Sequence, residues 1–188
     1  DGSYQKLAYI YNTDVLTVTS PALLFQNNGY EFPRPPFKVK VQVNGSDLDF
    51  DVIGLHLKAG FGNEDEMRRA AALELLEGTV RSGIEGSGDD DVIVLGDFNE
   101  TLDQGADILA PFLDASADYT FETALLAAAE DYTFIPSRNL IDHIVTSASL
   151  DDELAAAETV IPDLLDEVQG YTSEVSDHLP VILSFPAP

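Results

Sequence analysis

The stretch "DDDVIVLGDFNETLDQG" (89–105) decides the fold of this chain. Its four consecutive apolar residues, Val92 to Leu95, are typical of a strand that is buried on both faces. Gly96 then turns the chain, and Asp97 and Asn99 follow two residues apart. Side chains two residues apart in an extended chain point the same way, so this carboxylate and this amide can face one cleft.

Segments with the alternating pattern of strands and segments with the spacing of helices surround this strand. The segment "FKVKVQV" (37–43) alternates apolar and polar residues, and "NGSD" (44–47) then predicts a turn that returns the chain along "LDFDVIGLHL" (48–57) as a hairpin. The segment 63–83 opens with Asn63, has acids in its first turn and ends at Gly83, which predicts a helix. Further strands are expected at 6–12, 15–19, 140–147 and 179–185, and helical stretches near 104–113 and 122–130. We expect an acidic loop at 85–91 and a short helix or a loop at 151–161.

The order of these elements predicts an α/β (or α+β) class with a mixed sheet. With 188 residues, 45% hydrophobic residues and 23% charged residues, the chain fits one globular domain with a real core. No apolar run is long enough to span a membrane. The absence of cysteine excludes disulfides and thiolate metal sites.

The charge is unusual for a globular domain. The chain has 34 acidic and 9 basic residues, which gives a net charge of −25. This charge should repel a polyanion and disfavour the compact state through self-repulsion. At 1 M salt the Debye length falls to about 3 Å, so a high-salt habitat would screen the repulsion. The composition therefore favours a halophilic surface, and we interpret the runs 64–66 and 89–91 as solvated acids rather than metal sites.

Three motifs place chemically active residues at strand ends, and a fourth lies inside the expected strand 140–147. They are "HLK" (56–58), "GDFN" (96–99), "IDH" (141–143) and "SDH" (176–178), and they contain all three histidines of the chain. A single aspartate after a strand is most often a cap, and a single histidine is more often a hydrogen-bonded core residue than a ligand. Together the motifs favour a shared site, because binding sites in open α/β sheets gather at the carboxyl ends of strands.

The motifs, in this order and rough spacing, resemble those of the endonuclease/exonuclease/phosphatase superfamily, the relatives of pancreatic-type deoxyribonuclease and exonuclease III. The segments "RPPF" (34–37) and "YTFIPSRNLIDHI" (132–144) also look like bacterial members. The resemblance implies a mixed β-sandwich flanked by helices. It covers the chain from about residue 6 to its end but lacks the family's earlier strands and their metal-binding glutamate. We therefore expect 1–188 to be a single but incomplete domain of this type, with the amino-terminal part of the family fold missing.

The resemblance also implies a role for each matching residue. The family's equivalent of Asp97 orients or deprotonates the attacking water, and that of Asn99 holds the phosphate or the departing oxygen. His56 would face the scissile phosphate, His178 would hydrogen-bond a phosphate oxygen, and Asp142 would orient a catalytic histidine or stabilise the phosphate site.

Two kinds of supporting residue are implied as well. Asp177 is expected on or near the divalent cation, which would be Mg²⁺, or else Mn²⁺ or Ca²⁺. Lys58 and Arg138 are weaker candidates for phosphate contacts.

The function expected from this set is metal-dependent hydrolysis of a phosphodiester, with nucleic acid as the first substrate to consider. A phosphomonoesterase or phospholipase of sphingomyelinase or inositol-phosphatase type is the alternative, which the acidic charge favours. An inactive binding domain on the same scaffold is a third possibility, since the glutamate is missing. Exposed sheet edges predict self-association. The sequence does not determine the compartment, and we favour an extracellular or periplasmic one.

Overall fold

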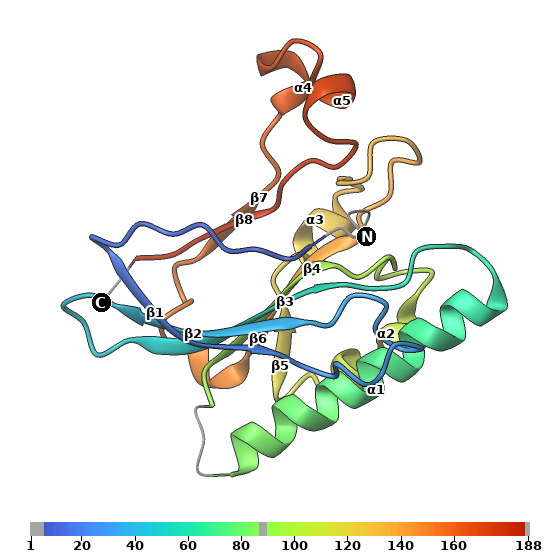
Figure 1. Ribbon diagram of the computed structural model, residues 1–188. Helices are drawn as coiled ribbons and strands as arrows, with labels where there is room; N and C mark the ends of the chain where they lie inside the picture. Colours follow the sequence, from blue (N-terminus) through green and yellow to red (C-terminus); the bar gives the residue numbers. More distant parts are fainter. Residues whose placement is uncertain (1–5, 87–89, 187–188) are drawn as a thin grey trace.

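The computed structural model describes residues 6–86 and 90–186. Its main sheet has six strands in the order β1-β2-β3-β4-β6-β5, and β7 and β8 form a second, two-stranded sheet (Figure 1). The strands are β1 (Leu16–Leu23), β2 (Phe37–Val43), β3 (Asp49–His56), β4 (Val92–Asp97), β5 (Tyr119–Phe121), β6 (Asp142–Ser147), β7 (Glu158–Val160) and β8 (Ile182–Ser184). The helices are α1 (Asn63–Glu85), α2 (Ala106–Leu113), α3 (Ala124–Ala128), α4 (Leu164–Glu167) and α5 (Tyr171–Glu174), with a 3-10 turn at Ala148–Leu150.

The predicted hairpin is formed by β2 and β3, which pair antiparallel around a turn in which Gly45 has a φ of +85°. The alternation of β2 buries its valines and leaves its lysines at the surface. There Lys38 pairs with Asp51 and Lys40 with Asp49, at 2.8 Å for the latter pair. The period-2 pattern thus gives the hairpin one apolar and one charged face, as the sequence predicts.

The step from β3 to β4 is the one parallel connection within the six-stranded sheet, and α1 provides the crossover. Parallel neighbours end at the same edge of a sheet, whereas β6 runs antiparallel to β4 and begins at that edge. The carboxyl ends of β3 and β4 therefore lie beside the first residue of β6. This arrangement positions the candidate site.

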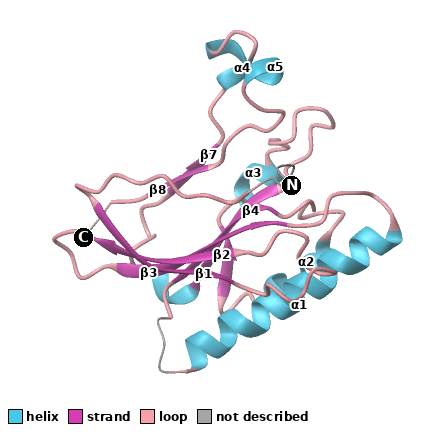
Figure 2. Ribbon diagram, viewed as in Figure 1, coloured by secondary structure: helices cyan, strands magenta, loops and turns pink. Residues whose placement is uncertain are grey.

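The two faces of the main sheet are covered differently (Figure 2). One face packs against α1 and α2 in an apolar cluster that includes the fully buried Leu73, Leu76 and Phe98. The other face packs against the segment that contains β8, through Val39, Phe50 and their neighbours. The result is a mixed sheet with helices on one side and a small second sheet on the other, so the predicted fold class is confirmed.

Three expected elements differ from the structure. Residues 6–12 form no strand, although Tyr9 is anchored to β2 and β3: its hydroxyl donates to Phe37 O at 2.6 Å and accepts from Gly54 N. β1 continues to Leu23 through an irregularity between Thr19 and Ala22, which an edge strand tolerates because its outer groups are unpaired.

The third difference is the strand expected at 179–185, of which only Ile182–Ser184 forms β8; the segment 151–161, expected to be a short helix or a loop, forms turns that lead into β7. The acidic loop expected at 85–91 lies partly outside the described residues, since 87–89 are not among them. In the part of the chain that the structure describes, no helix combines the length and apolarity needed to cross a membrane.

Gly96 provides a direct test of how closely β3 and β4 approach. Its φ is +134°, and a Cβ placed there would lie 2.1 Å from Leu55 O. We expect Gly96→Ala to lower the free energy of unfolding by about 2 kcal/mol or more, through backbone strain and this clash. In contrast Gly78, on the exposed side of α1, has open space around its Cβ position. Gly78→Ala should raise the free energy of unfolding by about 1 kcal/mol in the same urea titration. Equal effects of the two substitutions would contradict this account of the β3–β4 approach.

Candidate active site

Three candidate residues are direct neighbours across the main sheet. His56, the last residue of β3, pairs in register with Asp97, the last residue of β4. Asp97 in turn pairs with Asp142, the first residue of β6. Residues in register on adjacent strands point to the same face, so the sheet itself aligns these three side chains.

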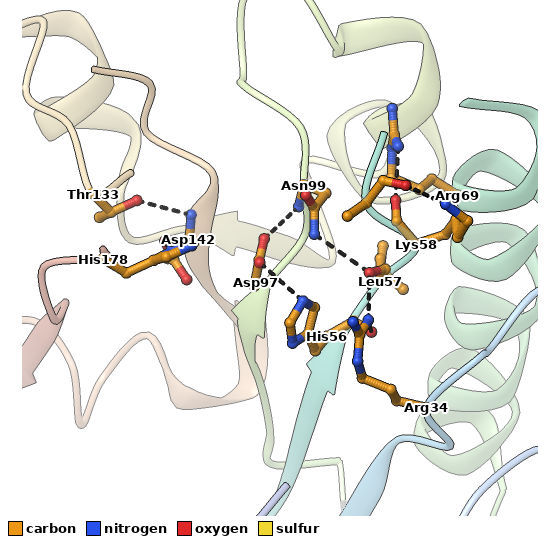
Figure 3. Close-up of polar contacts among 11 residues, drawn as sticks. Arg34, His56, Leu57, Lys58, Arg69, Asp97, Asn99, Thr133, Asp142 and His178 are labelled. Atoms are coloured by element: carbon orange, nitrogen blue, oxygen red, sulfur yellow. Dashed lines mark hydrogen bonds and ion pairs between the residues drawn. The ribbon is translucent and has the colours of Figure 1, made fainter. Parts of the chain in front are cut away.

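The GDFN motif gives each of its residues a separate structural task. Gly96 permits the close approach to β3, and Phe98 is completely buried, with its backbone N–H donating to Ile141 O at 2.9 Å. Asp97 Oδ1 accepts from the backbone N–H of Asn99 at 2.8 Å, and Oδ2 lies 3.3 Å from His56 Nε2. Both oxygens of the Asp97 carboxylate are therefore oriented, as Figure 3 shows.

Asn99 has a left-handed backbone conformation, with a φ of +53°. Asparagine tolerates this conformation better than most residues. Its side-chain Nδ2 donates to Leu57 O at 3.3 Å, which links the turn after β4 to the residue after β3. The left-handed turn explains how Asn99 remains beside Asp97 although the strand has ended.

His178 reaches the same place from a different part of the chain. Its Nδ1 donates to Asp142 Oδ2 at 2.7 Å, and its ring lies 4.9 Å from that of Phe134. The backbone around it is fixed by a bridge to Phe134 and by the N–H of Leu179, which donates to Thr133 O at 2.8 Å. The segment between α3 and β6 thus holds the SDH motif against β6.

Burial and neighbouring charges move the protonation equilibria in this group. Burial, reinforced by the Asp142 charge, raises the pKa of Asp97 to about 6. Burial, reinforced by the cationic Arg34 and His178, lowers the pKa of His56 to about 4. The hydrogen bond to Asp142 raises the pKa of His178 above its usual range. Near pH 7 the site therefore holds an ionised Asp97 and a neutral His56, and the hydrogen bond to Asp142 stabilises the protonated form of His178.

These residues face one cavity of about 860 Å³. Its lining includes His56, Asp97, Asn99, Asp142, Asp177 and His178 from the predicted set. It also includes Arg34, whose Nη1 donates to Leu57 O at 3.1 Å and to His56 O at 3.3 Å (Figure 3). The structure thus brings six of the eight predicted residues together.

Two predicted residues do not line this cavity. The Lys58 ammonium pairs with Asp65 of α1 at 2.7 Å, which turns it away from the phosphate role expected for it. Arg138 is exposed and its guanidinium lies over the Tyr132 ring, 4.6 Å from the centroid.

His143, the remaining histidine of the chain, belongs to the core. It is 1% exposed, and its Nε2 donates to Glu100 O at 2.9 Å while Nδ1 accepts from the Thr123 hydroxyl at 2.8 Å. Burial lowers its pKa to about 4, so it remains neutral. It follows the common pattern of a hydrogen-bonded core histidine.

Sequence reasoning did not identify Arg34 as a site residue. The sequence feature that could have identified it is the "RPPF" segment, where Pro33 and Pro35 on either side of Arg34 restrict the backbone before β2. The position of that segment over the carboxyl end of β3 depends on the fold and cannot be read from local pattern.

The donor set of the site fits a divalent cation. Oxygens of Asp97 and Asp142 and a ring nitrogen of His178 lie within 4.8 Å of one another. Carboxylate oxygens suit Mg²⁺, Mn²⁺ and Ca²⁺, and a cation would relieve the repulsion between the two carboxylates. His178 Nδ1 is engaged by Asp142, so Asp97 and Asp142 are the groups that would hold the ion. Asp177, the predicted ligand, lines the cavity but lies outside this cluster among the described residues.

Comparison with models of protein families finds no match, and no curated protein matches the sequence. Several solved structures do match. The human Nocturnin catalytic domain with bound sulfate has 20% identity and a TM-score of 0.60, and covers 93% of this chain. A mannosyl-6-phosphatase from Bacteroides thetaiotaomicron has 18% identity, a TM-score of 0.59 and 94% coverage. D. rerio TDP2 complexed with a single-strand DNA product has 14% identity, a TM-score of 0.62 and 93% coverage.

A Bacteroides thetaiotaomicron protein of the endonuclease/exonuclease/phosphatase family is also among the matching structures. At these identities the likeness shows the fold, and it confirms the fold that the motifs predict. The chain spans 62% of the Nocturnin domain, 69% of the phosphatase and 70% of the TDP2 chain.

The raised pKa of Asp97 predicts a stabilising substitution. Between about pH 4 and pH 6 the folded chain binds more protons at this carboxyl than the unfolded chain does, so its contribution to stability falls as the pH rises through that window. Asp97→Asn removes the buried charge and keeps an oxygen for Asn99 N–H. In metal-free buffer at pH 7 it should raise the free energy of unfolding by on the order of 1–3 kcal/mol, with no gain near pH 4.

The matched control is Asp152→Asn, which removes one negative charge at an exposed turn. Its effect on the free energy of unfolding should stay within about 0.5 kcal/mol. If Asp97→Asn stabilises no more than Asp152→Asn in parallel urea titrations, burial does not penalise the Asp97 charge.

Proposed function

We propose that this site hydrolyses phosphate esters by attack of water on phosphorus. The observation that carries the proposal is the convergence of two carboxylate–histidine pairs, Asp97 with His56 and Asp142 with His178, on one cavity that Asn99 also lines. Such a set supplies a base, a cationic hydrogen-bond donor and a neutral polar donor within one hollow. The shared fold with a phosphatase and with TDP2 bound to a DNA product supports the same reaction class.

Asp97 is the group that receives the proton of the attacking water. In the metal-free site its pKa is about 6, so a carboxylate with a raised proton affinity faces the cavity near neutral pH, as general-base catalysis requires. This role needs the cation to be held mainly by Asp142, because direct bonding to Asp97 would lower that pKa. Asn99 N–H and His56 hold both of its oxygens, so the base is oriented before substrate binds. As the water oxygen bonds to phosphorus, the water proton moves to Asp97; the bond to the leaving oxygen breaks, and that oxygen keeps the bonding pair and takes a proton from solvent.

His178 stabilises the negative charge of the phosphoryl oxygens. Asp142 binds Nδ1 and favours the imidazolium, so Nε2 also carries a proton that a phosphate oxygen can accept. Asn99 supplies a neutral amide donor at the cavity, His56 keeps its one N–H on Asp97, and the Arg34 guanidinium adds a positive charge at the cavity wall. A bound Mg²⁺, Mn²⁺ or Ca²⁺ would supply further charge neutralisation at the phosphate.

A phosphodiester such as DNA is the first substrate class that we propose, and TDP2 bound to a single-strand DNA product is its structural support. One observation favours a second class, a small phosphomonoester or a lipid headgroup. The exposed Glu66 and Asp107 line the cavity, and the whole chain has a net charge of −25, which opposes a polyanion at low salt.

The activity test uses the full-length gene product with Mg²⁺ or Mn²⁺ and a panel of substrates. The panel contains single-stranded DNA, bis-p-nitrophenyl phosphate, inositol phosphates and sphingomyelin. We expect hydrolysis that falls by about 100-fold or more in Asp97→Asn and in His178→Ala, because general-base and charge-stabilising groups each contribute on that scale. Asp152→Asn should be unchanged.

Each outcome of this panel has a definite meaning. Preference for DNA even at low salt supports the phosphodiester proposal and removes the small-substrate alternative. No turnover of any member with any divalent cation would leave a non-catalytic binding domain and contradict the proposed function.

We also propose that the acidic surface is adapted to high salt. Raising KCl from 0.1 M to 2 M should increase the free energy of unfolding at pH 7, because screening weakens the repulsion among carboxylates. Urea titrations at each salt concentration measure this change. Near the sequence pI of about 4.1 the net charge is small and the gain should largely disappear. A salt effect of the same size at both pH values would show that charge repulsion is not its cause.

A further inference from the structure

Arg69 is a buried cation in the middle of an apolar helix face. It is 2% exposed, and it lies on α1 among buried residues such as Ala72, Leu73 and Leu76. Its Nε and Nη2 contact Glu100 Oε1 at 2.6 Å and 2.5 Å. Its Nη1 donates to two backbone carbonyls, Lys58 O and Gly60 O, both at 2.8 Å (Figure 3 shows the Lys58 contact).

These contacts join the two loops that follow the strand ends bearing His56 and Asp97. Lys58 and Gly60 belong to the loop that follows His56 at the end of β3. Glu100 belongs to the turn that follows Asp97 and Asn99 at the end of β4. The last ladder contact between the two segments is Leu57 N–H to Asp97 O at 2.9 Å, so beyond it Arg69 is a principal link between the loops.

Glu100 is held from other directions as well. Its backbone carbonyl accepts from His143 Nε2, at 2.9 Å, and so ties the turn to β6. A Cβ at Gly105 would lie 2.5 Å from Glu100 Oε2, so the chain packs closely around this carboxylate. Burial raises the pKa of Glu100, and the Arg69 guanidinium opposes that shift. A side chain fixed on both sides can transmit the position of α1 to the GDFN turn.

Stability alone is a weak reason for this arrangement. Burying an ion pair costs about as much desolvation free energy as its attraction returns, and replacing such a pair with apolar residues of similar size is often neutral or stabilising. The pair instead contributes a fixed geometry, because the planar guanidinium group sets the directions in which its hydrogen-bond acceptors must lie. Active sites need such fixed geometry, because displacing a catalytic group by about 1 Å can lower the reaction rate about 100-fold.

We infer that Arg69 and Glu100 are a positioning pair that holds His56, Asp97 and Asn99 in reactive geometry. The inference rests on the proposed function for its catalytic consequence, but its structural content does not. It divides the site into two halves. The Arg69–Glu100 pair fixes the half made by the loops after β3 and β4, whereas the Phe134 bridge fixes His178 beside Asp142 independently.

The test replaces the pair without leaving a buried unpaired charge. Arg69→Met alone would leave Glu100 unpaired and can fail to fold, so the main variant is the double substitution Arg69→Met with Glu100→Met. The matched control is Arg68→Met, which removes the neighbouring guanidinium of the same helix. Arg68 contacts Tyr30 instead, with its Nε 2.6 Å from Tyr30 O. Thermal unfolding of each variant verifies that it folds.

The first readout is NMR of the imidazole C–H signals, which needs no activity. The chain has three histidines, so each signal reports on one place. In the double variant we expect the His56 signal to shift or broaden, while the His178 signal stays as in wild type. In Arg68→Met both should be unchanged. An unaltered His56 signal in a folded double variant would overturn the inference, whatever the activity.

The second readout is kinetic and uses the best substrate of the full-length protein. The double variant should lose about 100-fold in kcat with KM changed by only a few-fold, because the displaced groups act in the reaction step. Arg69→Lys, which keeps the charge but not the fork, should fall between it and wild type. A folded double variant with wild-type kcat contradicts the positioning role. Inactive wild-type protein with a displaced His56 signal contradicts the proposed function but not the pair.

Discussion

The structure depends on the register of three adjacent strands. β3 and β4 run parallel and β6 runs against them, so His56, Asp97 and Asp142 become neighbours in one row at the edge of the sheet. This row requires β3 and β4 to approach closely at Gly96, where a side chain would strike Leu55 O. A shift by one residue would turn every side chain of a strand to the opposite face and separate the row. The backbone ladder therefore aligns the row of strand-end residues, and the Arg69–Glu100 pair holds the loops that follow it.

Electrostatics then assigns different states to similar residues. Two histidines each lie beside an aspartate, yet burial keeps His56 neutral while the bond to Asp142 favours the cationic form of His178. Asp97 is buried more completely than an ordinary surface carboxyl, and its proton affinity rises accordingly. Pairs of groups whose environments push their pKa values apart are typical of acid–base sites. Here the difference follows from the hydrogen bond between His178 and Asp142, and from burial and the positive charge of Arg34 at His56.

Sequence patterns predicted those parts of the structure that depend on local periodicity. The alternation in 37–43, the apolar run in 92–95 and the helix from Asn63 all correspond to observed elements, although the N-cap of that helix is Gly62 rather than Asn63 and it continues past Gly83 to Glu85. Motif resemblance placed six residues that the fold does bring to one cavity. Its limits are also physical. Residues 6–12 have a strand-like composition, but a strand exists only where a partner ladder exists, and here the Tyr9 side chain provides the anchor instead.

The features that the sequence did not reveal involve contacts between distant segments. Lys58 follows the expected strand, but Asp65 in the first turn of α1 binds its ammonium, and only the packing of α1 determines this pairing. Arg34 enters the site because its loop crosses the end of β3, which local sequence does not reveal. The burial of Arg69 could not be predicted for the same reason, because a charged residue in an amphipathic helix is usually solvated.

The central claim is that one cavity binds a phosphate group between Asp97 and His178. The most direct measurement is a crystal structure of the protein soaked with Mn²⁺ and inorganic phosphate, with anomalous scattering used to locate the metal. The account predicts an oxyanion within hydrogen-bond distance of His178 and Asn99, with Mn²⁺ at the carboxylates of Asp97 and Asp142. Phosphate and Mn²⁺ bound only elsewhere on the molecule, with this cavity holding water alone at saturating concentrations, would contradict it.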